Sequence, residues 1–486
     1  MERFDLVVRG GTVVTATDVM QADLGIRAES IAAIAEGLDA GRREIDARGL
    51  LVMPGGVDTH SHIEQLAATG LMNADTFESA TRSAAFGGTT TVISFAAQHV
   101  GMNLTQVVEE YHRLAEKGAV IDYAFHMILA DPTEEVLYNQ LPPLVREGHS
   151  SIKVFMTYDR LRIDDEKLLD VLAAARDNGA LVMVHAENHG MINWMAKRLL
   201  SRGYVDPKYH GVAHPRVCEM EAFTRLIACA ALIDQPIMIY HVSTREGLDV
   251  IRRARGDGLK VFAETCPQYL FLTKEDLDKP RLHGAKWICS PPVRDVADQE
   301  ALWNALGLGD LQVISSDHAP YAFDRSGKLA AGEKPNFKEI ANGMPGLQWR
   351  LPLVFDAVAK GRATLPQFVA WTATEPAKIY GLHPKKGTIA IGADADIAIW
   401  DPNKTVAIDD AMVMDRSGYT PWIGRTITGW PSAVIRRGTV IVENGNILAP
   451  AGSGKFLARS AGAAAKPAGR NAPEFDPRLN FWAKLR

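Results

Sequence analysis

The chain has 486 residues, of which 47% are hydrophobic, and its formal net charge at pH 7 is -5. A chain of this length can bury a large core, so we expect one large catalytic domain with a smaller companion rather than a small disulfide-stapled fold. The negative charge offers no basic field to phosphate backbones, which argues against a nucleic-acid partner. Four scattered cysteines lack the C-x-x-C spacing of a structural zinc site and fit a reducing compartment: Cys218, Cys229, Cys266 and Cys289.

The chain starts Met-Glu-Arg-Phe-Asp-Leu-Val-Val-Arg-Gly, with charges where a secretory signal would have its apolar stretch. No later run approaches the length needed to cross a bilayer. We therefore expect a cytoplasmic protein with no membrane partner.

Short strands are predicted at both ends of the chain. Near the start, apolar runs separated by glycine or polar turns cover residues 6–8, 12–15, 23–26 and 31–34. Residues 388–401 and 433–443 read as strands as well. The simplest arrangement is one β-sandwich domain assembled from both chain termini, residues 1–54 plus 386–450. Two independent terminal lobes are the alternative.

Between these ends, apolar runs alternate with amphipathic helices. The predicted strands are 89–95, 151–156, 181–185, 236–241, 261–263 and 311–315, and the predicted helices are 104–117, 164–177 and 245–255. Repeated strand-then-helix units over residues 55–385 predict an α/β fold with a parallel sheet, of a length that suits a closed (β/α)8 TIM-like barrel. An open doubly wound sheet is the main competitor.

The last part of the chain, residues 451–486, is predicted to be a C-terminal extension. Its first half is rich in alanine, glycine and lysine, and apolar residues return at Phe475, Leu479, Phe481 and Trp482. This pattern favours an extended arm.

Polar residues follow or interrupt the apolar runs of the predicted barrel at regular places. In such a barrel the chemistry lies at the carboxyl ends of the strands, so these residues are expected on one rim. They are four imidazoles, a lysine and a carboxylate: His60, His62, Lys153, His185, His241 and Asp317.

The His60-x-His62 pair suits a metal, because alternate residues of an extended backbone project to the same side. Two unrelated solvent-facing histidines are the plainer interpretation of an isolated pair. His185 and His241 are each compatible with a structural role, and their shared position at strand ends carries the inference. Asp317 could instead cap a helix before Ala-Pro. At a strand end it could also exchange a proton with an attacking hydroxide.

Lys153 is the most informative of these residues. An unpaired ammonium inside an apolar strand costs several kcal/mol and is normally avoided. A neutral lysine amine can react with carbon dioxide to form a carbamate, whose two oxygens and negative charge can bridge two cations. The alternative is a lysine paired with a carboxylate such as Asp317 or Glu187.

Together these motifs resemble the dihydropyrimidinase and hydantoinase branch of the amidohydrolase superfamily, from about residue 6 to residue 445. The segments that carry the resemblance are 53–62 (Met-Pro-Gly-Gly-Val-Asp-Thr-His-Ser-His), 87–91, 152–158 (Ile-Lys-Val-Phe-Met-Thr-Tyr), 184–188, 264–270, 289–294 (Cys-Ser-Pro-Pro-Val-Arg), 342–346 and 392–402.

The resemblance implies a barrel with a β-sandwich and two zinc ions, or other divalent metals, bridged by carboxylated Lys153. It implies that His60, His62 and Asp317 bind one metal and that His185 and His241 bind the other. Tyr158 would donate a hydrogen bond to the developing oxyanion, and the backbones at Ser290 and Asn342 would hold the ring. A core tyrosine and two turn formers are the plainer interpretations of these three residues.

By the same resemblance, the substrate is a small cyclic amide. Metal-activated hydroxide would open a dihydropyrimidine or hydantoin ring to an N-carbamoyl amino acid, with Asp317 returning the proton to the departing nitrogen. The resemblance also implies a homotetramer, or a homodimer, in which the C-terminal arm contacts a neighbour.

Some residues depart from the family pattern. Where the family has a Met-Pro step after the histidine pair, this chain has Ile63-Glu64-Gln65-Leu66, and Ser94 and Ala341 also differ. Three alternatives therefore stay open. They are an allantoinase- or dihydroorotase-like ring hydrolase, a mononuclear deaminase, and a non-catalytic scaffold of the dihydropyrimidinase-related kind.

Overall fold

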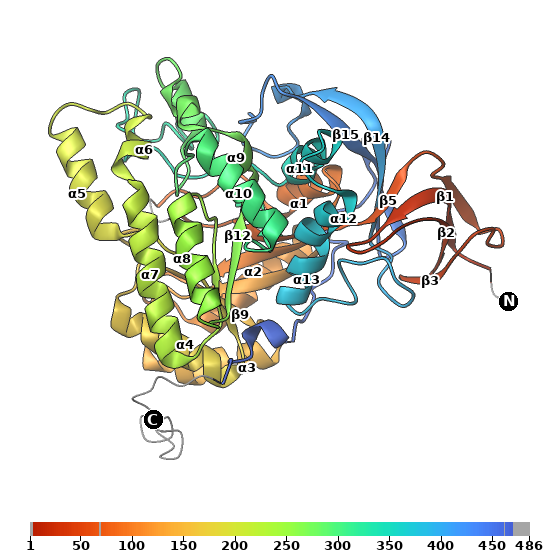
Figure 1. Cartoon of the computed structure of the whole chain (residues 1–486), viewed down its shortest axis with the longest axis horizontal. Coiled ribbons are helices and arrows are strands. Elements are labelled where there is room, and N and C mark those ends of the chain that lie inside the picture. The colour runs from red at the N-terminus through yellow and green to blue at the C-terminus, as the bar shows by residue number, and fades with distance from the viewer. Residues whose placement is uncertain (1–2, 68–69, 461, 470–486) are drawn as a thin grey trace.

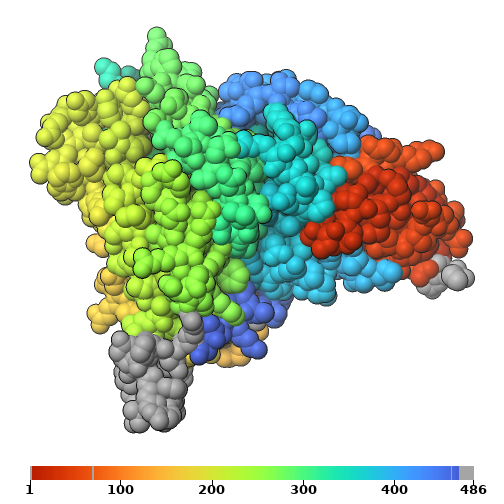
Figure 2. All heavy atoms as spheres, viewed as in Figure 1, coloured from red at the N-terminus to blue at the C-terminus, as the bar shows by residue number. Residues whose placement is uncertain are grey.

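The computed structural model describes residues 3–67, 70–460 and 462–469. Figure 1 shows two parts, a helix-covered body and a smaller lobe of strands beside it. In Figure 2 the N-terminal strands, in red, form a lobe that projects from the larger body. Among the described residues, no helix combines the length and the apolar character needed to cross a bilayer.

The smaller part is a mixed sheet built from both ends of the chain. Within the described residues its order is β17-β16-β15-β14-β5-β1-β2-β3, with β4 beside β1. Antiparallel pairing of β5 with β14 joins the two halves, which confirms a β-sandwich from both termini and excludes independent terminal lobes. The strands are β1 (Leu6–Val14), β2 (Val19–Arg27), β3 (Ser30–Ala35), β4 (Arg43–Asp46), β5 (Leu51–Pro54), β14 (Ile397–Ala407), β15 (Thr426–Arg436), β16 (Thr439–Glu443) and β17 (Asn446–Ile447).

Two predicted strands near the end of the chain were wrong in extent. The segment 388–401 enters the sheet only at Ile397, because a turn around Gly392, which has a φ of 88°, precedes it. The segment 433–443 is a hairpin rather than one strand. Arg437 and Gly438 both have positive φ, as a tight two-residue hairpin turn requires.

The larger part is a closed parallel barrel. Among the described residues eight strands pair in chain order, from β6 to β13. A parallel bridge between Ser61 and His318 closes the ring, and Arg350 donates to the carbonyls of both Val57 and Ile314 across the seam. This confirms the (β/α)8 barrel over the open sheet. The strands are β6 (Gly56–Ser61), β7 (Thr89–Ala97), β8 (Asp122–Ile128), β9 (Ser151–Phe155), β10 (Leu181–His185), β11 (Ile237–Ile239), β12 (Val261–Thr265) and β13 (Val313–Ile314).

Helices cover the outside of the barrel. Capping residues that can be recognised in the sequence set where these helices begin and end. In α4, Asp164 caps the first turn by accepting from Lys167 N, and Gly179 ends the helix with a φ of 68°. The α-helices are α1 (Phe77–Phe86), α2 (Leu104–Gly118), α3 (Leu141–Arg146), α4 (Asp165–Asn178), α5 (His189–Leu200), α6 (Tyr209–Ala213), α7 (Arg216–Ile233), α8 (Arg245–Gly256), α9 (Pro267–Phe271), α10 (Val296–Leu308), α11 (Arg350–Ala359), α12 (Leu365–Val369) and α13 (Glu375–Ile379). Shorter 3-10 or π segments are η1 (Glu135–Gln140), η2 (Lys274–Asp278), η3 (His283–Trp287), η4 (Ala370–Thr374), η5 (Asp410–Met412) and η6 (Ala463–Ala465).

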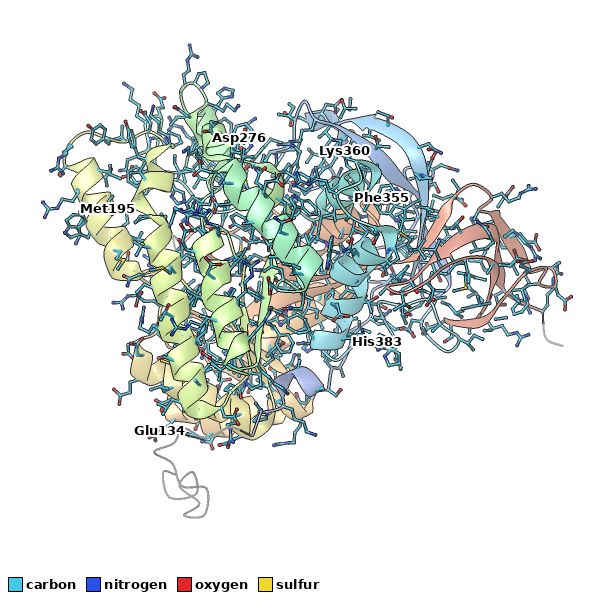
Figure 3. The ribbon with its side chains drawn as sticks, in the orientation of Figure 1. Glu134, Met195, Asp276, Phe355, Lys360 and His383 are labelled. Carbon is cyan, nitrogen blue, oxygen red and sulfur yellow. The ribbon has the colours of Figure 1, made fainter. Side chains whose placement is uncertain are left out.

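The two parts pack through aromatic side chains. Phe355 of α11, labelled in Figure 3, stacks on Trp400 of β14 with ring centroids 4.9 Å apart. Gly429 lets the backbone of β15 approach this pair, because a Cβ there would lie 2.0 Å from the Phe355 ring. The boundaries 1–54 plus 386–450 and 55–385 stay predictions.

The first part of the C-terminal extension runs back along the barrel. Tyr123 N donates to Lys455 O, and Lys260 Nζ donates to the carbonyls of Ala463 and Lys466. The arm expected around Phe475 and Trp482 lies outside the described residues.

Candidate active site

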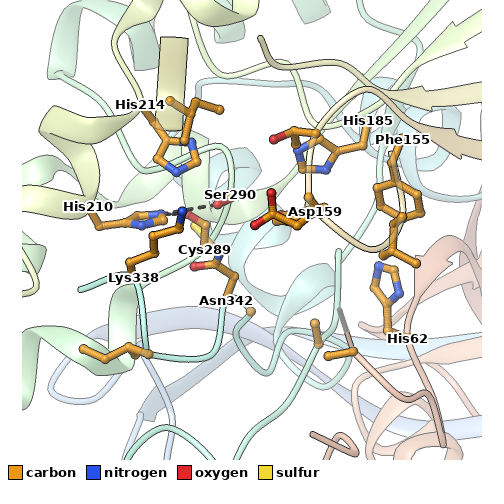
Figure 4. Close-up of a pocket in the computed structure, with 18 of the residues that line it drawn as sticks. His62, Phe155, Asp159, His185, His210, His214, Cys289, Ser290, Lys338 and Asn342 are labelled. Carbon is orange, nitrogen blue, oxygen red and sulfur yellow. Dashed lines mark hydrogen bonds between the residues drawn. The ribbon is translucent and has the colours of Figure 1, made fainter. Parts of the chain in front are cut away.

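A cavity of about 380 Å³ opens at the carboxyl ends of the barrel strands. All nine residues singled out from the sequence line it: His60, His62, Lys153, Tyr158, His185, His241, Ser290, Asp317 and Asn342. Figure 4 shows Cys289, Ser290 and Asn342 on one side of this pocket and His62 on the other. The topology therefore brings together residues that are up to 282 positions apart in the chain, from His60 to Asn342.

Three of these residues form a compact ligand group. Possible ligand atoms of His60, His62 and Asp317 all lie within 4.8 Å of one another. His60 Nε2 is 3.1 Å and His62 Nε2 is 3.5 Å from Asp317 Oδ1. No helix begins directly after Asp317, since the next one is α11 at Arg350, so the helix-cap interpretation of this residue was wrong.

The far side of each histidine ring in this group is held in place. Glu264 Oε1 lies 2.5 Å from His60 Nδ1, and Gln65 Oε1 lies 2.7 Å from His62 Nδ1. Such bonds to the second nitrogen orient metal-ligating imidazoles and set their tautomer. Gln65, a departure from the family pattern, thus orients the predicted ligand His62. Glu264 was missed from the sequence, although it occupies a barrel strand, β12, like the predicted ligands.

The other two predicted imidazole ligands, His185 and His241, are also in contact with each other. His241 Nε2 lies 2.9 Å from His185 Nδ1, and Glu187 Oε2 lies 2.8 Å from His185 Nε2. His241 Nδ1 is buried without a hydrogen-bond partner in the described part of the chain. Burial lowers the pKa of His185, and lowers those of His60 and His241 far below the usual value. The rings are therefore neutral, which is the form that binds metals.

Lys153 lies between these groups in the centre of β9. Its side chain is fully buried, and its Nζ has no hydrogen-bond partner among the residues that the structure describes. Neither Asp317 nor Glu187 pairs with it, so the simple ion-pair interpretation was wrong. Its Nζ lies 3.9 Å from the centroid of the Tyr240 ring. Burial lowers the pKa of Lys153 to about 7.

Three residues of the pocket have backbone conformations that side chains normally avoid. The φ angles are 74° at Tyr158, 41° at His241 and 48° at Asp317. Each such residue costs about 1–3 kcal/mol and persists only where the surrounding structure holds it. Strain at three pocket residues is typical of a site shaped for function.

The predicted substrate contacts face the same cavity. Burial raises the pKa of Tyr158 well above its usual value, so its hydroxyl remains a hydrogen-bond donor at neutral pH. The side-chain Oδ1 of Asn342 is buried without a partner in the described structure. Ser290 Oγ lies 3.3 Å from His210 Nε2, which also lies 2.8 Å from Cys289 O. His210, which lies in α6, was not singled out from the sequence, and it lines the pocket as well.

The donor set fits two divalent metal ions. It combines neutral imidazoles, a carboxylate and a buried amine with no partner of its own among the described residues. Neutral imidazole and carboxylate oxygen are ligands of zinc and related ions. A cationic ammonium would repel metal ions here, and burial, which lowers the pKa of Lys153 to about 7, disfavours that charged form.

The chain is similar to known proteins over most of its length. The model of the amidohydrolase family matches residues 51–441. A D-hydantoinase from Ralstonia pickettii is 41% identical and covers 94% of this chain and 99% of its own. A D-hydantoinase from Geobacillus stearothermophilus is 42% identical over 93% of this chain and 96% of its own. The solved structure of a dihydropyrimidinase from Brevibacillus agri superposes with a TM-score of 0.91 at 40% identity, covering 94% of this chain and 99% of that one. The chain therefore belongs to the amidohydrolase family, within its hydantoinase and dihydropyrimidinase branch, and is a cyclic amidohydrolase.

Proposed function

We propose that the protein opens the ring of a cyclic ureide or imide, converting a dihydropyrimidine or a hydantoin to an N-carbamoyl amino acid. The observation that carries the proposal is the buried amine of Lys153, which lacks a hydrogen-bond partner among the described residues and lines the same pocket as His60, His62, His185, His241 and Asp317. Burying an amine without a hydrogen-bond partner costs free energy, and a modification that gives the group metal ligands would offset that cost.

Lys153 is proposed to be N6-carboxylated. Its lowered pKa, about 7, leaves much of the amine neutral at physiological pH, and the neutral nitrogen can attack carbon dioxide. A C–N bond forms, one proton leaves to solvent, and the side chain becomes an anionic carbamate. His60, His62 and Asp317 would hold one zinc ion, His185 and His241 would hold a second, and the carbamate of Lys153 would serve as a further ligand. When bound, such metals supply acidity to water and polarise the carbonyl under attack.

The residues of the chain would then handle the substrate and its protons. Asp317 takes the proton of the attacking water and delivers it to the ring nitrogen as the amide C–N bond breaks. Tyr158 donates a hydrogen bond to the carbonyl oxygen as negative charge develops on it. The backbones at Ser290 and Asn342 hold the ring's amide and carbonyl groups. The new C–O bond leaves a carboxylate on one end of the product and a carbamoyl group on the other.

Side-by-side hydrolysis assays test the proposal. The zinc-loaded protein is given dihydrouracil, hydantoin, 5-substituted hydantoins, allantoin, dihydroorotate and succinimide. We expect a hydantoin or dihydrouracil to be preferred, with kcat/KM of about 10⁴ M⁻¹ s⁻¹ or more. Preference for allantoin or dihydroorotate would favour the related ring hydrolases. Purified protein without metal and without activity on any of these rings would favour the scaffold.

We also propose a homotetramer, with a homodimer as the alternative. The support is the family to which the chain belongs. Light scattering after size-exclusion chromatography measures the molar mass, and a value near the 53.0 kDa of one chain would contradict both assemblies.

A further inference from the structure

The segment between Asp317 and Asn342 leaves the barrel and covers the pocket. Residues 319–341 contribute Tyr321, Phe337 and Lys338 to the cavity wall. Helices and strands are absent from it in the described structure, so its shape depends on individual contacts. One of its residues, Lys328, is fully buried.

Lys328 ties two other segments together. Its Nζ donates to the carbonyl of Ile288 at 2.9 Å and to the carbonyl of Ala341 at 2.7 Å. Ile288 precedes Cys289 and Ser290, and Ala341 directly precedes Asn342. Gly343 N donates to the same Ile288 carbonyl at 3.0 Å. The amine therefore lies at the junction of the two stretches of backbone that face the substrate.

Burying the Lys328 amine costs free energy, which indicates that its contacts with the Ile288 and Ala341 carbonyls have a role. No ion pair joins Lys328 to a carboxylate in the described part of the chain, and burial lowers the pKa of its amine to about 7. An apolar side chain of similar length would fill the space without burying a polar group. Both the charged and the neutral amine carry enough N–H groups to serve two carbonyls, so the junction survives either state.

We infer that Lys328 is a positioning residue that sets the spacing between the Ser290 and Asn342 backbones and thereby the affinity for the ring. The inference rests on the proposed function for the identity of the ligand. Contacts to the ring that exist in the bound substrate and in the transition state alike affect KM more than kcat. Loss of the Lys328 amine should therefore appear mainly as a higher KM.

The first test compares Lys328→Met with Lys334→Met, an exposed lysine of the same segment. For Lys328→Met we expect a KM for hydantoin raised by about tenfold or more, since two buried carbonyls lose a donor, with kcat changed by less than about threefold. Metal content should match the wild type. Lys334→Met should leave both constants unchanged. Equal losses in kcat and kcat/KM, or an unchanged KM, would overturn the inference.

Hydrogen exchange gives a readout that does not depend on turnover. In Lys328→Met, peptides covering residues 288–292 and 340–344 should exchange faster, while peptides of β9 and β10 keep their wild-type rates. Uniformly faster exchange would mean a general loss of stability and would contradict positioning. Should Lys328→Met fail to fold, Lys328→Gln, which keeps two N–H donors on a shorter side chain, is measured instead, and the same two outcomes apply.

The two proposals can fail separately. If the wild type hydrolyses no cyclic amide, the proposed function falls, while the exchange comparison still decides whether Lys328 holds the two segments. If the wild type hydrolyses hydantoin but Lys328→Met shows neither the KM change nor local exchange, the inference alone falls.

Discussion

Two buried lysines, in two regions of the molecule, show how differently one residue type can be used. At the junction between barrel and terminal sheet, Lys386 Nζ makes ion pairs with Asp122 at 2.7 Å, Asp396 at 2.8 Å and Asp394 at 3.0 Å. At the barrel rim, the equally buried Lys153 has no hydrogen-bond partner within the described chain.

The surroundings move the two pKa values in opposite directions. Burial alone lowers the pKa of a lysine, and for Lys153 this effect prevails. For Lys386 the attraction of Asp396 and Asp122 outweighs burial and raises the pKa above its usual value. At the junction the lysine is paired with three carboxylates, whereas the amine at the rim has no hydrogen-bond partner among the described residues. That difference distinguishes a structural charge from a functional one, and the following predictions probe it in order of decreasing effect.

The largest effect is expected from Lys153→Met. The variant cannot form the proposed carbamate ligand, so kcat/KM should fall by about 1000-fold or more and bound zinc should decrease. The free energy of unfolding of the metal-free protein should not fall, because no hydrogen bond is lost. Activity assays, elemental analysis and urea denaturation measure the three quantities. Retained zinc and activity would show that Lys153 is a structural residue.

Lys386→Met should have the reverse profile. Three carboxylates would lose their common cation, which costs about 3–5 kcal/mol for a buried pair broken on one side. Urea denaturation should show this loss, whereas zinc content and kcat per folded molecule should stay near the wild-type values. A variant as stable as the wild type would show that the ion pairs of Lys386 do not stabilise the fold, and would contradict its assignment as a structural charge.

Tyr158→Phe tests another rim residue, whose hydroxyl is proposed to contact the substrate. Removing one hydrogen-bond donor to a developing oxyanion lowers kcat by about 100- to 1000-fold. Stability should change by less than about 0.5 kcal/mol, since only a hydroxyl is removed. Steady-state kinetics and thermal unfolding measure both, and a variant with wild-type kcat would remove Tyr158 from the proposed mechanism.

The smallest effect concerns pH. In metal-free protein, free of carbon dioxide, folded Lys153 releases its proton at about pH 7, whereas the unfolded chain holds it to about pH 10.4. Between these values the unfolded chain binds more protons, so stability rises with pH, by at least about 1 kcal/mol. Lys153→Met should show a smaller rise, and the part that remains should come from Lys328, whose pKa is also lowered.

The pKa of Lys386 is shifted in the opposite direction, so its effect on the pH dependence of stability is different. Its raised pKa means that its stabilisation is fully present below the unfolded value of about 10.4 and is lost only above it. The stability difference between wild type and Lys386→Met should therefore stay constant from about pH 7 to about pH 10. Urea denaturation across this range checks both lysines, and parallel pH profiles for the two variants would contradict the assignment.

Much of the site was predictable because it depends on local patterns. Lys153 stands out inside an apolar strand, and His60 and His62 alternate on extended backbone, so their chemistry can be recognised without knowing the fold. Lys386 gives no such signal. It follows Pro384 and Lys385 like a surface residue, and its partner Asp122 lies 264 positions earlier.

The residue pattern alone predicts the alternation of strands and helices, and with it the single rim on which the predicted ligands lie, because parallel strands all end at the same edge. It did not determine which groups lie behind that rim. Glu264 behind His60, Gln65 behind His62 and the two carbonyls around Lys328 follow from closure of the barrel and from loop paths. These contacts join groups at irregular distances along the chain, so no sequence pattern predicts them. They can be identified only once the chain is folded.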